Sequence, residues 1–250
     1  MKKNIILFII SICYSAMASA QVGDYRNVWS LGASGGVAMN KVSFMPDVSQ
    51  TMHQGSTFGI AARYTSEKYF STICSIQFEC NIAQLGWKED IKTLNGDGVR
   101  NPETTEYEAY ERDMTYVQIP ILAHLAWGKE RRGFNFFING GPQFGLKIKE
   151  QTTKNYNLPF VEGNFPDFTG GLPRANAVVA QETMEVKNNF DYGIALGAGI
   201  ECDIKHVGRF SLEGRYYYGL GDMFGNAKTD EFGKSANGTV YVKMSYMHNL

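Results

Sequence analysis

The chain has 250 residues, with 24 Lys and Arg against 25 Asp and Glu, so its formal net charge is −1. This balance lacks the basic surface that a nucleic-acid partner requires, and we predict no nucleic-acid partner. Glycine (27), tyrosine (14) and phenylalanine (16) are abundant. After residue 20 no apolar run reaches 18 residues, which excludes a transmembrane helix and leaves a soluble β-sandwich or a membrane barrel.

Residues 1–20 have the three parts of a secretory signal peptide. Two lysines precede the apolar residues 5–12, which are too few to span a bilayer, and a small-x-small pattern ends at Ala20. We predict cleavage before Gln21, with residues 21–250 forming one exported domain. An uncleaved anchor helix is the alternative.

Alternation of apolar with polar or small residues then recurs about eight times, as expected of strands with one face in each environment. In the sixth segment, alternate residues from Tyr192 to Cys202 are mostly apolar, whereas those from Gly193 to Asp203 are small or acidic. The predicted strands are 29–39, 55–65, 70–87, 114–127, 133–149, 184–203, 208–221 and 238–249.

The predicted connections alternate in length along the chain. Short links fall at 66–69, 128–132 and 204–207, and long ones at 40–54, 88–113, 150–183 and 222–237. Outer-membrane barrels have this asymmetry. We therefore predict an all-β fold, a single eight-stranded antiparallel up-and-down transmembrane β-barrel with short periplasmic turns, long extracellular loops and both termini in the periplasm.

Aromatic residues gather near the short-turn end, where an interfacial girdle is expected. They are Trp29, Tyr64, Trp127, Phe134 and Phe210. The third segment is longer than the roughly 9–11 residues that cross a membrane, and it ends on Trp87. We predict that this strand continues outside the bilayer.

If the apolar faces meet lipid, the opposite faces point into the barrel and carry charges of both signs. An eight-stranded barrel is narrow enough for side chains to fill, and buried charges must be paired. We predict a polar, plugged interior without a continuous pore, in which the small residues of the first and sixth strands leave room for Arg63, Arg215 and Tyr217. The predicted interior residues are Arg63, Glu79, Gln118, His124, Asn139, Lys147, Glu201, Glu213, Arg215 and Lys243.

Candidate catalytic and metal-binding residues have weak support. Glu201, Glu213 and Arg215 could form a carboxylate pair with a cation, but paired inward charge is what a plugged barrel needs anyway. The four histidines have no H-x-x-H or H-E-x-x-H spacing, so we predict no metal site, no cofactor and no enzyme activity. A barrel hydrolase in which His53 reaches an acid on another loop remains an alternative.

The cysteines of the exported part are odd in number, and all lie at predicted lipid-facing positions. Cys74, Cys80 and Cys202 are therefore interpreted as small apolar residues rather than as a disulfide framework.

Five ordered segments resemble the PorT-like outer-membrane β-barrel family. They are WSLGASGG at 29–36, YVQIPILAHL at 116–125, FINGGPQFG at 137–145, DYGIALGAGIE at 191–201 and RYYYGL at 215–220. The resemblance spans nearly all of the exported chain and implies an eight-stranded barrel. Three features depart from the family: Gln118 replaces a common acid, the chain ends on Leu250 rather than an aromatic residue, and the loop 150–183 is individual.

These observations favour an outer-membrane protein of a Gram-negative bacterium, in contact with outer-membrane lipid. The first functional hypothesis is a closed scaffold that displays its loops to envelope proteins or other partners. The resemblance implies a second, an accessory component of a secretion system that contacts secretion proteins. A small channel is disfavoured by the interior charge, and a barrel hydrolase is the fourth hypothesis.

Overall fold

A computed structural model describes residues 24–93, 95–101, 104–128, 133–156, 160–161, 165–166, 179–204, 207–225 and 231–250. The predicted signal peptide at residues 1–20 lies outside these ranges, so its cleavage and the start of the domain at Gln21 stay predictions. No helix in the described part of the chain has the length and apolar character to cross a membrane. A single 3-10 turn, η1 (Ala180–Glu182), is present there.

Eight long strands dominate the described residues. They are β1 (Asp24–Met45), β3 (His53–Tyr69), β4 (Thr72–Glu89), β5 (Tyr110–Gly128), β6 (Gly133–Lys154), β9 (Phe190–Ile204), β10 (Gly208–Gly219) and β11 (Lys234–Asn249). Three strands of two residues each accompany them: β2 (Gln50–Thr51), β7 (Phe160–Val161) and β8 (Phe165–Pro166).

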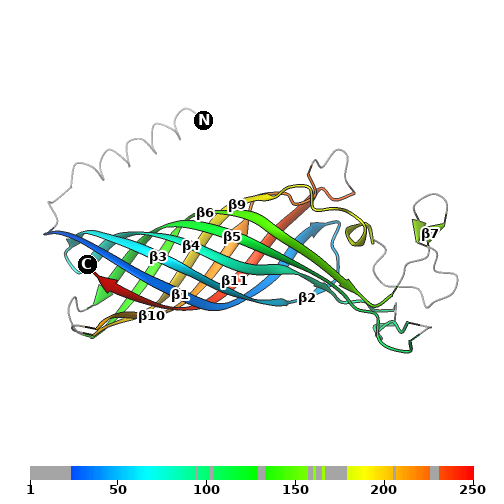
Figure 1. Ribbon diagram of the computed structural model, residues 1–250, viewed down its shortest axis with the longest axis horizontal. Coiled ribbons are helices and arrows are strands. Elements are labelled where there is room, and N and C mark those ends of the chain that lie inside the picture. The colour runs from blue at the N-terminus through cyan, green and yellow to red at the C-terminus, as the bar shows by residue number, and fades with distance from the viewer. Residues whose placement is uncertain are drawn as a thin grey trace, which may run out of the picture.

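The eight long strands form a closed barrel. Each is antiparallel to its neighbours in the order β4-β3-β1-β11-β10-β9-β6-β5, and pairing of β4 with β5 closes the ring. Figure 1 shows the tilted strands, with the start of β1 and the C-terminus at the same end as the short turns. The predicted eight-stranded up-and-down barrel is confirmed.

Some predicted strand ends were wrong. The sixth strand was predicted from residue 184, but β9 begins at Phe190 because residues 184–189 cross the mouth of the barrel, where Val186 is buried. The third was predicted from Phe70, which instead occupies a turn with a φ of 50°. The seventh was predicted to reach residue 221, but β10 ends at Gly219.

The long connections are shorter than predicted because the strands continue past the apolar belt. β1 extends to Met45, β6 to Lys154, and β5 and β11 begin at Tyr110 and Lys234. β1, at 22 residues, is about twice as long as the roughly 9–11 residues that cross a membrane. The barrel therefore projects well beyond a bilayer at the end opposite the short turns.

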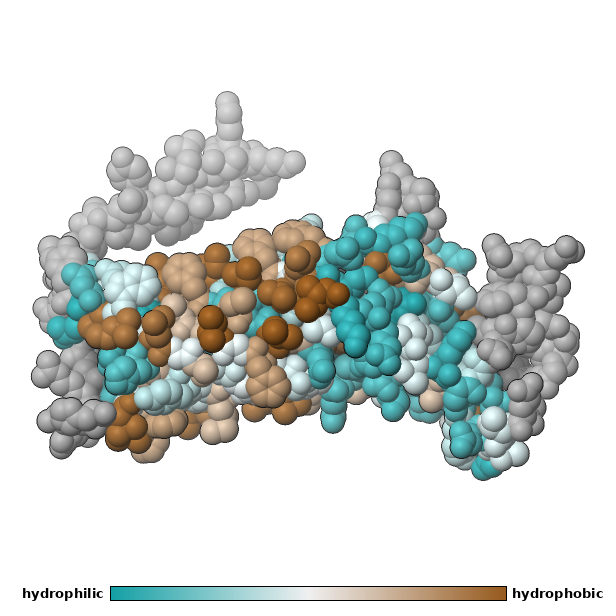
Figure 2. Space-filling view, viewed as in Figure 1, coloured by the Kyte–Doolittle hydropathy of each residue, from teal (hydrophilic) through white to brown (hydrophobic). Residues whose placement is uncertain are grey.

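The outer surface divides into two zones. Figure 2 shows apolar residues over the part of the barrel next to the short turns and polar residues over the projecting part. Phe58, Ile60 and Leu196 are among the exposed apolar side chains of the belt. Cys74, Cys80 and Cys202 are free thiols whose side chains are exposed or partly exposed.

Candidate functional site in the lumen and mouth of the barrel

An ionic cluster fills the lumen near the short-turn end. Glu201 Oε2 accepts a hydrogen bond from Arg63 Nη1 at 2.8 Å and lies 3.6 Å from His124 Nε2. Arg209 lies 3.7 Å from Glu201 and 3.1 Å from Asp203. Arg63, His124 and Glu201 are almost completely buried. Burial in a low-dielectric interior requires such pairing, because an isolated charge there would be very costly.

A second ionic cluster lies at mid-barrel. Arg215 forms a two-pronged contact with Glu79, with Nη2–Oε1 and Nη1–Oε2 distances of 2.6 and 3.0 Å. Arg215 Nε also donates to Glu213 at 2.5 Å, and Lys243 Nζ donates to Glu79 at 2.7 Å. The two clusters are joined by Gln77, whose Oε1 accepts from Arg63 and whose Nε2 donates to Glu79.

These contacts connect opposite walls of the barrel. Four steps around the ring separate β3, which carries Arg63, from β9, which carries Glu201. The same separation applies to β4 with Glu79 and β10 with Arg215. Since side chains from facing walls meet in hydrogen-bond contact, the network crosses the lumen at two levels.

The remaining predicted interior residues occupy other levels. Gln118 on β5 accepts a hydrogen bond of 2.9 Å from the Tyr241 hydroxyl on β11, again across the lumen. Asn139 is buried, opposite His124 of the first cluster in the β5–β6 pairing and next to Gly197 like Glu213 of the second. Lys147 lies instead at the mouth, where its ammonium contacts Glu150 at 2.5 Å and the Val186 carbonyl at 2.8 Å.

The carboxylate pair considered from the sequence is not assembled. Arg215 contacts Glu79 and Glu213, whereas Glu201 belongs to the cluster of Arg63. Arg209 was missed, although it shares the inward parity of Glu213 and Arg215 on β10.

Small residues make space for the bulky interior groups. A Cβ on Gly193 would lie 2.8 Å from Tyr217 Cε2, and one on Gly197 would lie 2.7 Å from Glu213 Oε1. Both distances are shorter than any real carbon contact, so the lumen is filled to the backbone of β9 at these points.

An aromatic cluster closes the mouth above the polar lumen. Phe44, Trp87, Phe224 and Phe232 pack with ring centroids 5.0–6.3 Å apart, and the Tyr110 ring lies tilted beside Trp87 at 6.4 Å. Trp87, Tyr110, Phe224 and Phe232 are 0% exposed. Burial raises the pKa of Tyr110 to about 12. Sequence reasoning missed this cluster, although Trp87 shares the inward parity of Glu79 on β4.

His53 lies in a cleft on the outer side of the projecting barrel. Its Nε2 is 2.6 Å from Asp113 Oδ1 and 3.5 Å from Glu111 Oε1. His53 was expected to reach an acid on another loop. The acid that it contacts, Asp113, lies on strand β5. The His53 Nδ1 has no hydrogen-bond partner in the described part of the chain.

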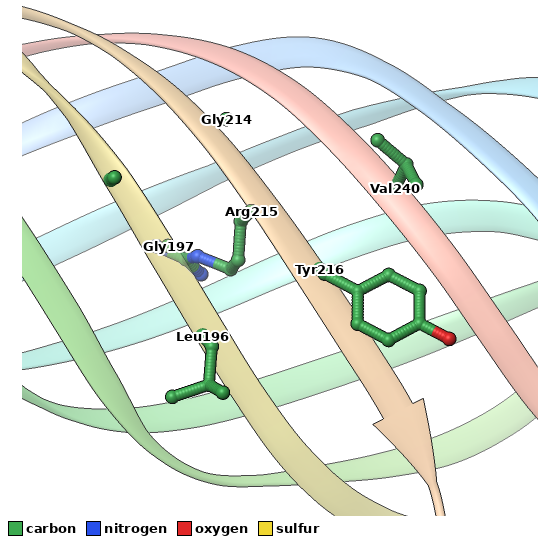
Figure 3. A pocket seen from close by; sticks show the side chains of 7 residues that line it. Leu196, Gly197, Gly214, Arg215, Tyr216 and Val240 are labelled. Carbon is green, nitrogen blue, oxygen red and sulfur yellow. The ribbon is translucent and has the colours of Figure 1, made fainter.

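A shallow groove of about 390 Å³ marks the apolar outer surface around Gly214. Leu196, Tyr216 and Val240 surround it, as Figure 3 shows. A Cβ on Gly214 would meet no atom within 4 Å, so the groove exists because this outward position lacks a side chain. Its apolar walls suit contact with lipid chains rather than recognition of a polar ligand.

A closed eight-stranded barrel with an apolar outer belt, a paired ionic interior and short turns at one end defines the class of outer-membrane β-barrel proteins. A family model described as "Outer membrane protein beta-barrel domain" matches residues 19–225, and the chain belongs to that family. Membership places the protein in the lipid bilayer of a Gram-negative outer membrane. The short turns then face the periplasm and the mouth faces the exterior.

No curated protein matches the chain. Among solved structures, Ail of Yersinia pestis bound to sucrose octasulfate is similar at 12% identity over 89% of this chain and 100% of that chain, with a TM-score of 0.35. Neisserial surface protein A is similar at 9% identity over 87% of this chain and 96% of that chain, with a TM-score of 0.39. OprG from Pseudomonas aeruginosa is similar at 11% identity over 90% of this chain and 98% of that chain, with a TM-score of 0.40. Similarity at this level says nothing about function.

Proposed function

We propose that this outer-membrane barrel is a closed, non-enzymatic scaffold whose function is exerted by its extracellular end. The observation that carries the proposal is the pair of barriers across the lumen. Ion pairs join facing walls at two levels, and an aromatic cluster fills the mouth above them. A permeating ion would have to break buried, charge-assisted hydrogen bonds and then pass a buried apolar cluster.

Planar-bilayer recording tests whether the barrel is closed. The purified chain is expected to give no stable ion conductance. A double variant, Arg215→Ala with Trp87→Ala, removes one side chain from each barrier and is expected to leak measurably more than the native chain. Steady channels of one defined size in the native protein would contradict the proposal.

A hydrolase has less support than a scaffold. His53 and Asp113 supply two members of a possible triad, but a nucleophile must also lie within hydrogen-bond reach of the histidine. No hydroxyl or thiol in the described part of the chain forms a hydrogen bond with His53. The chain should therefore cleave a p-nitrophenyl ester no faster than its His53→Ala variant.

The projecting end offers exposed groups for a partner. Tyr107 is exposed, and the Arg100 guanidinium stacks on its ring at 4.8 Å. Exposed aromatic and arginine side chains are typical anchors of protein interfaces. A photo-reactive amino acid at Tyr107 is expected to crosslink a protein partner in cells, whereas the same probe at Ile60, which is exposed in the apolar belt, should label only lipid.

A role as an accessory component of a PorT-type secretion system is the second candidate, and the five segments that resemble that family favour it. Deletion of the gene followed by comparison of the secreted proteins tests this role. A changed set of secreted proteins, restored by the native gene, would support the secretion role. An unchanged set would exclude it and leave the scaffold proposal intact.

A further inference from the structure

The outer cleft near the mouth assembles three metal-ligand side chains from two strands. His53 lies at the start of β3, and Glu111 and Asp113 alternate along the start of β5. One ligand atom from each side chain lies within 4.8 Å of the other two. We propose that these residues form a binding site for a divalent transition metal such as Zn²⁺, open to the exterior of the cell.

An irregular stretch of the barrel wall directs His53 to this place. Pairing of β3 with β4 stops at Thr57↔Ala83 and resumes, through β2, at Thr51↔Lys88. Five residues, 52–56, therefore face four residues, 84–87. An extra residue of this kind re-aims a side chain, and such bulges recur beside functional sites. Here the imidazole crosses β4 and reaches the carboxylates of β5.

The imidazole is buried, whereas the carboxylates are partly exposed and have room to rotate. The His53 side chain is 2% exposed, and those of Glu111 and Asp113 are 38% and 50% exposed. Imidazole and carboxylate are the donors that Zn²⁺ takes at about 2.0–2.2 Å, which sets neighbouring ligand atoms about 3.3 Å apart in a tetrahedral site. The distances of 2.6 and 3.5 Å from His53 Nε2 bracket that value, so small rotations of exposed carboxylates suffice.

The present hydrogen bond does not satisfy all three groups. Carboxylates only accept, so Nε2 must donate its single proton to Asp113, and Glu111 receives none. Nδ1 is left buried without a partner in the described residues. A cation in place of the Nε2 proton would bind both carboxylates at once, and the imidazole proton would then lie on Nδ1.

The surrounding cleft leaves room for further ligands. It has a volume of about 220 Å³ and is lined by His53 and Asp113 together with Gln54, Gln84, Thr115 and Lys149. Water or an amide oxygen could occupy a fourth position. Lys149 is a cation on the cleft wall, so its charge should weaken metal binding. Removal of the Lys149 charge should therefore tighten metal binding, whereas loss of a ligand should weaken it.

Cobalt titration tests the site, because Co²⁺ accepts the same ligands as Zn²⁺ and absorbs visible light. The full chain in detergent, stripped with EDTA, is expected to bind one Co²⁺ with visible absorption bands that added Zn²⁺ abolishes. His53→Ala and Glu111→Gln should each weaken binding by about tenfold or more. Lys149→Met should tighten it. His248→Ala, at the opposite end of the barrel, should leave it unchanged.

Two outcomes would overturn the proposal. One is a native chain that binds no Co²⁺ or Zn²⁺, measured by both absorption and calorimetry. The other is binding of equal affinity in the native chain and in Glu111→Gln. Glu111 is an exposed side chain, so this variant should fold even if His53→Ala does not. The heat-dependent gel shift typical of a folded barrel verifies folding of each variant before titration.

Discussion

The lumen within the membrane and the mouth outside it are closed by opposite chemistries. In the lumen, four cations (Arg63, Arg209, Arg215 and Lys243) are paired with four carboxylates (Glu79, Glu201, Asp203 and Glu213). In the mouth, a buried aromatic cluster packs like the core of a soluble protein. The belt faces lipid, so the lumen must take the polar half of each strand, whereas the mouth is surrounded by water and can put its apolar side chains inside.

Because the lumen depends on paired charges, removal of one of them should lower the free energy of unfolding more than any change at the mouth. Glu79→Ala leaves Arg215 and Lys243 without their shared carboxylate, and we expect the free energy of unfolding to fall by about 3–5 kcal/mol. Urea unfolding of the barrel in lipid vesicles measures it. Glu79→Gln keeps one hydrogen-bond acceptor and should lose less. A loss below about 1 kcal/mol for Glu79→Ala would show that the lumen charges are not mutually dependent.

The stability of the mouth should fall at alkaline pH, because Tyr110 is buried there in an apolar cluster. Burial raises the pKa of Tyr110 to about 12, above an ordinary value of 10. The buried, protonated phenol therefore contributes fully to the free energy of unfolding below pH 10. This contribution is lost as the pH rises to 12, because the unfolded chain releases the phenol proton first. The loss should reach about 2–3 kcal/mol. Unfolding between pH 9 and 12 measures it, and Tyr110→Phe should remove this part of the pH dependence.

Matched glycine variants compare the filled lumen with the lipid-facing surface. A Cβ on Gly197 collides with Glu213 and Asn139, whereas one on Gly214 meets nothing. We expect Gly197→Ala to cost about 1–3 kcal/mol in urea unfolding, as overpacking does. Gly214→Ala should be neutral or slightly stabilising, because glycine weakens a strand. Equal effects would indicate that the lumen has free space beside β9.

The smallest effect is expected for loss of a polar atom from the mouth. The Trp87 Nε1 is buried without a hydrogen-bond partner among the described residues. Trp87→Phe removes that group together with some packing, so we expect a cost of about 1 kcal/mol. The rate of thermolysin cleavage at the mouth measures it. A loss as large as that of Glu79→Ala would mean that the mouth depends on polar contacts after all.

Much of the fold was predictable because alternation is a local property of each strand. The inward parity of Arg63, Glu79, Glu201 and Arg215 follows from their neighbours in the sequence, and the structure buries all four. Strand ends were less predictable. The stretch before Phe190 alternates well enough to look like a strand. It lies instead across the mouth, where Val186 is buried.

Partners across the barrel could not be predicted. Parity says that Arg63 and Arg215 point inward, but the tilt and register of eight strands decide that one meets Glu201 and the other meets Glu79. The aromatic cluster has the same origin, since Phe44, Trp87 and Phe224 come from separate parts of the chain. His53 and Asp113, 60 residues apart, meet only because an irregular β3–β4 pairing re-aims the imidazole.

Residue pattern along the chain was enough to establish the class of fold, the inner and outer face of each strand, and the alternation of short and long connections, because these depend on residues close together in the chain. The folded barrel was needed to show how the lumen is closed, what fills the mouth and which carboxylates His53 contacts. Those contacts join strands on facing or non-adjacent walls, or a strand with a connection at the mouth, and their geometry exists only once the ring has closed.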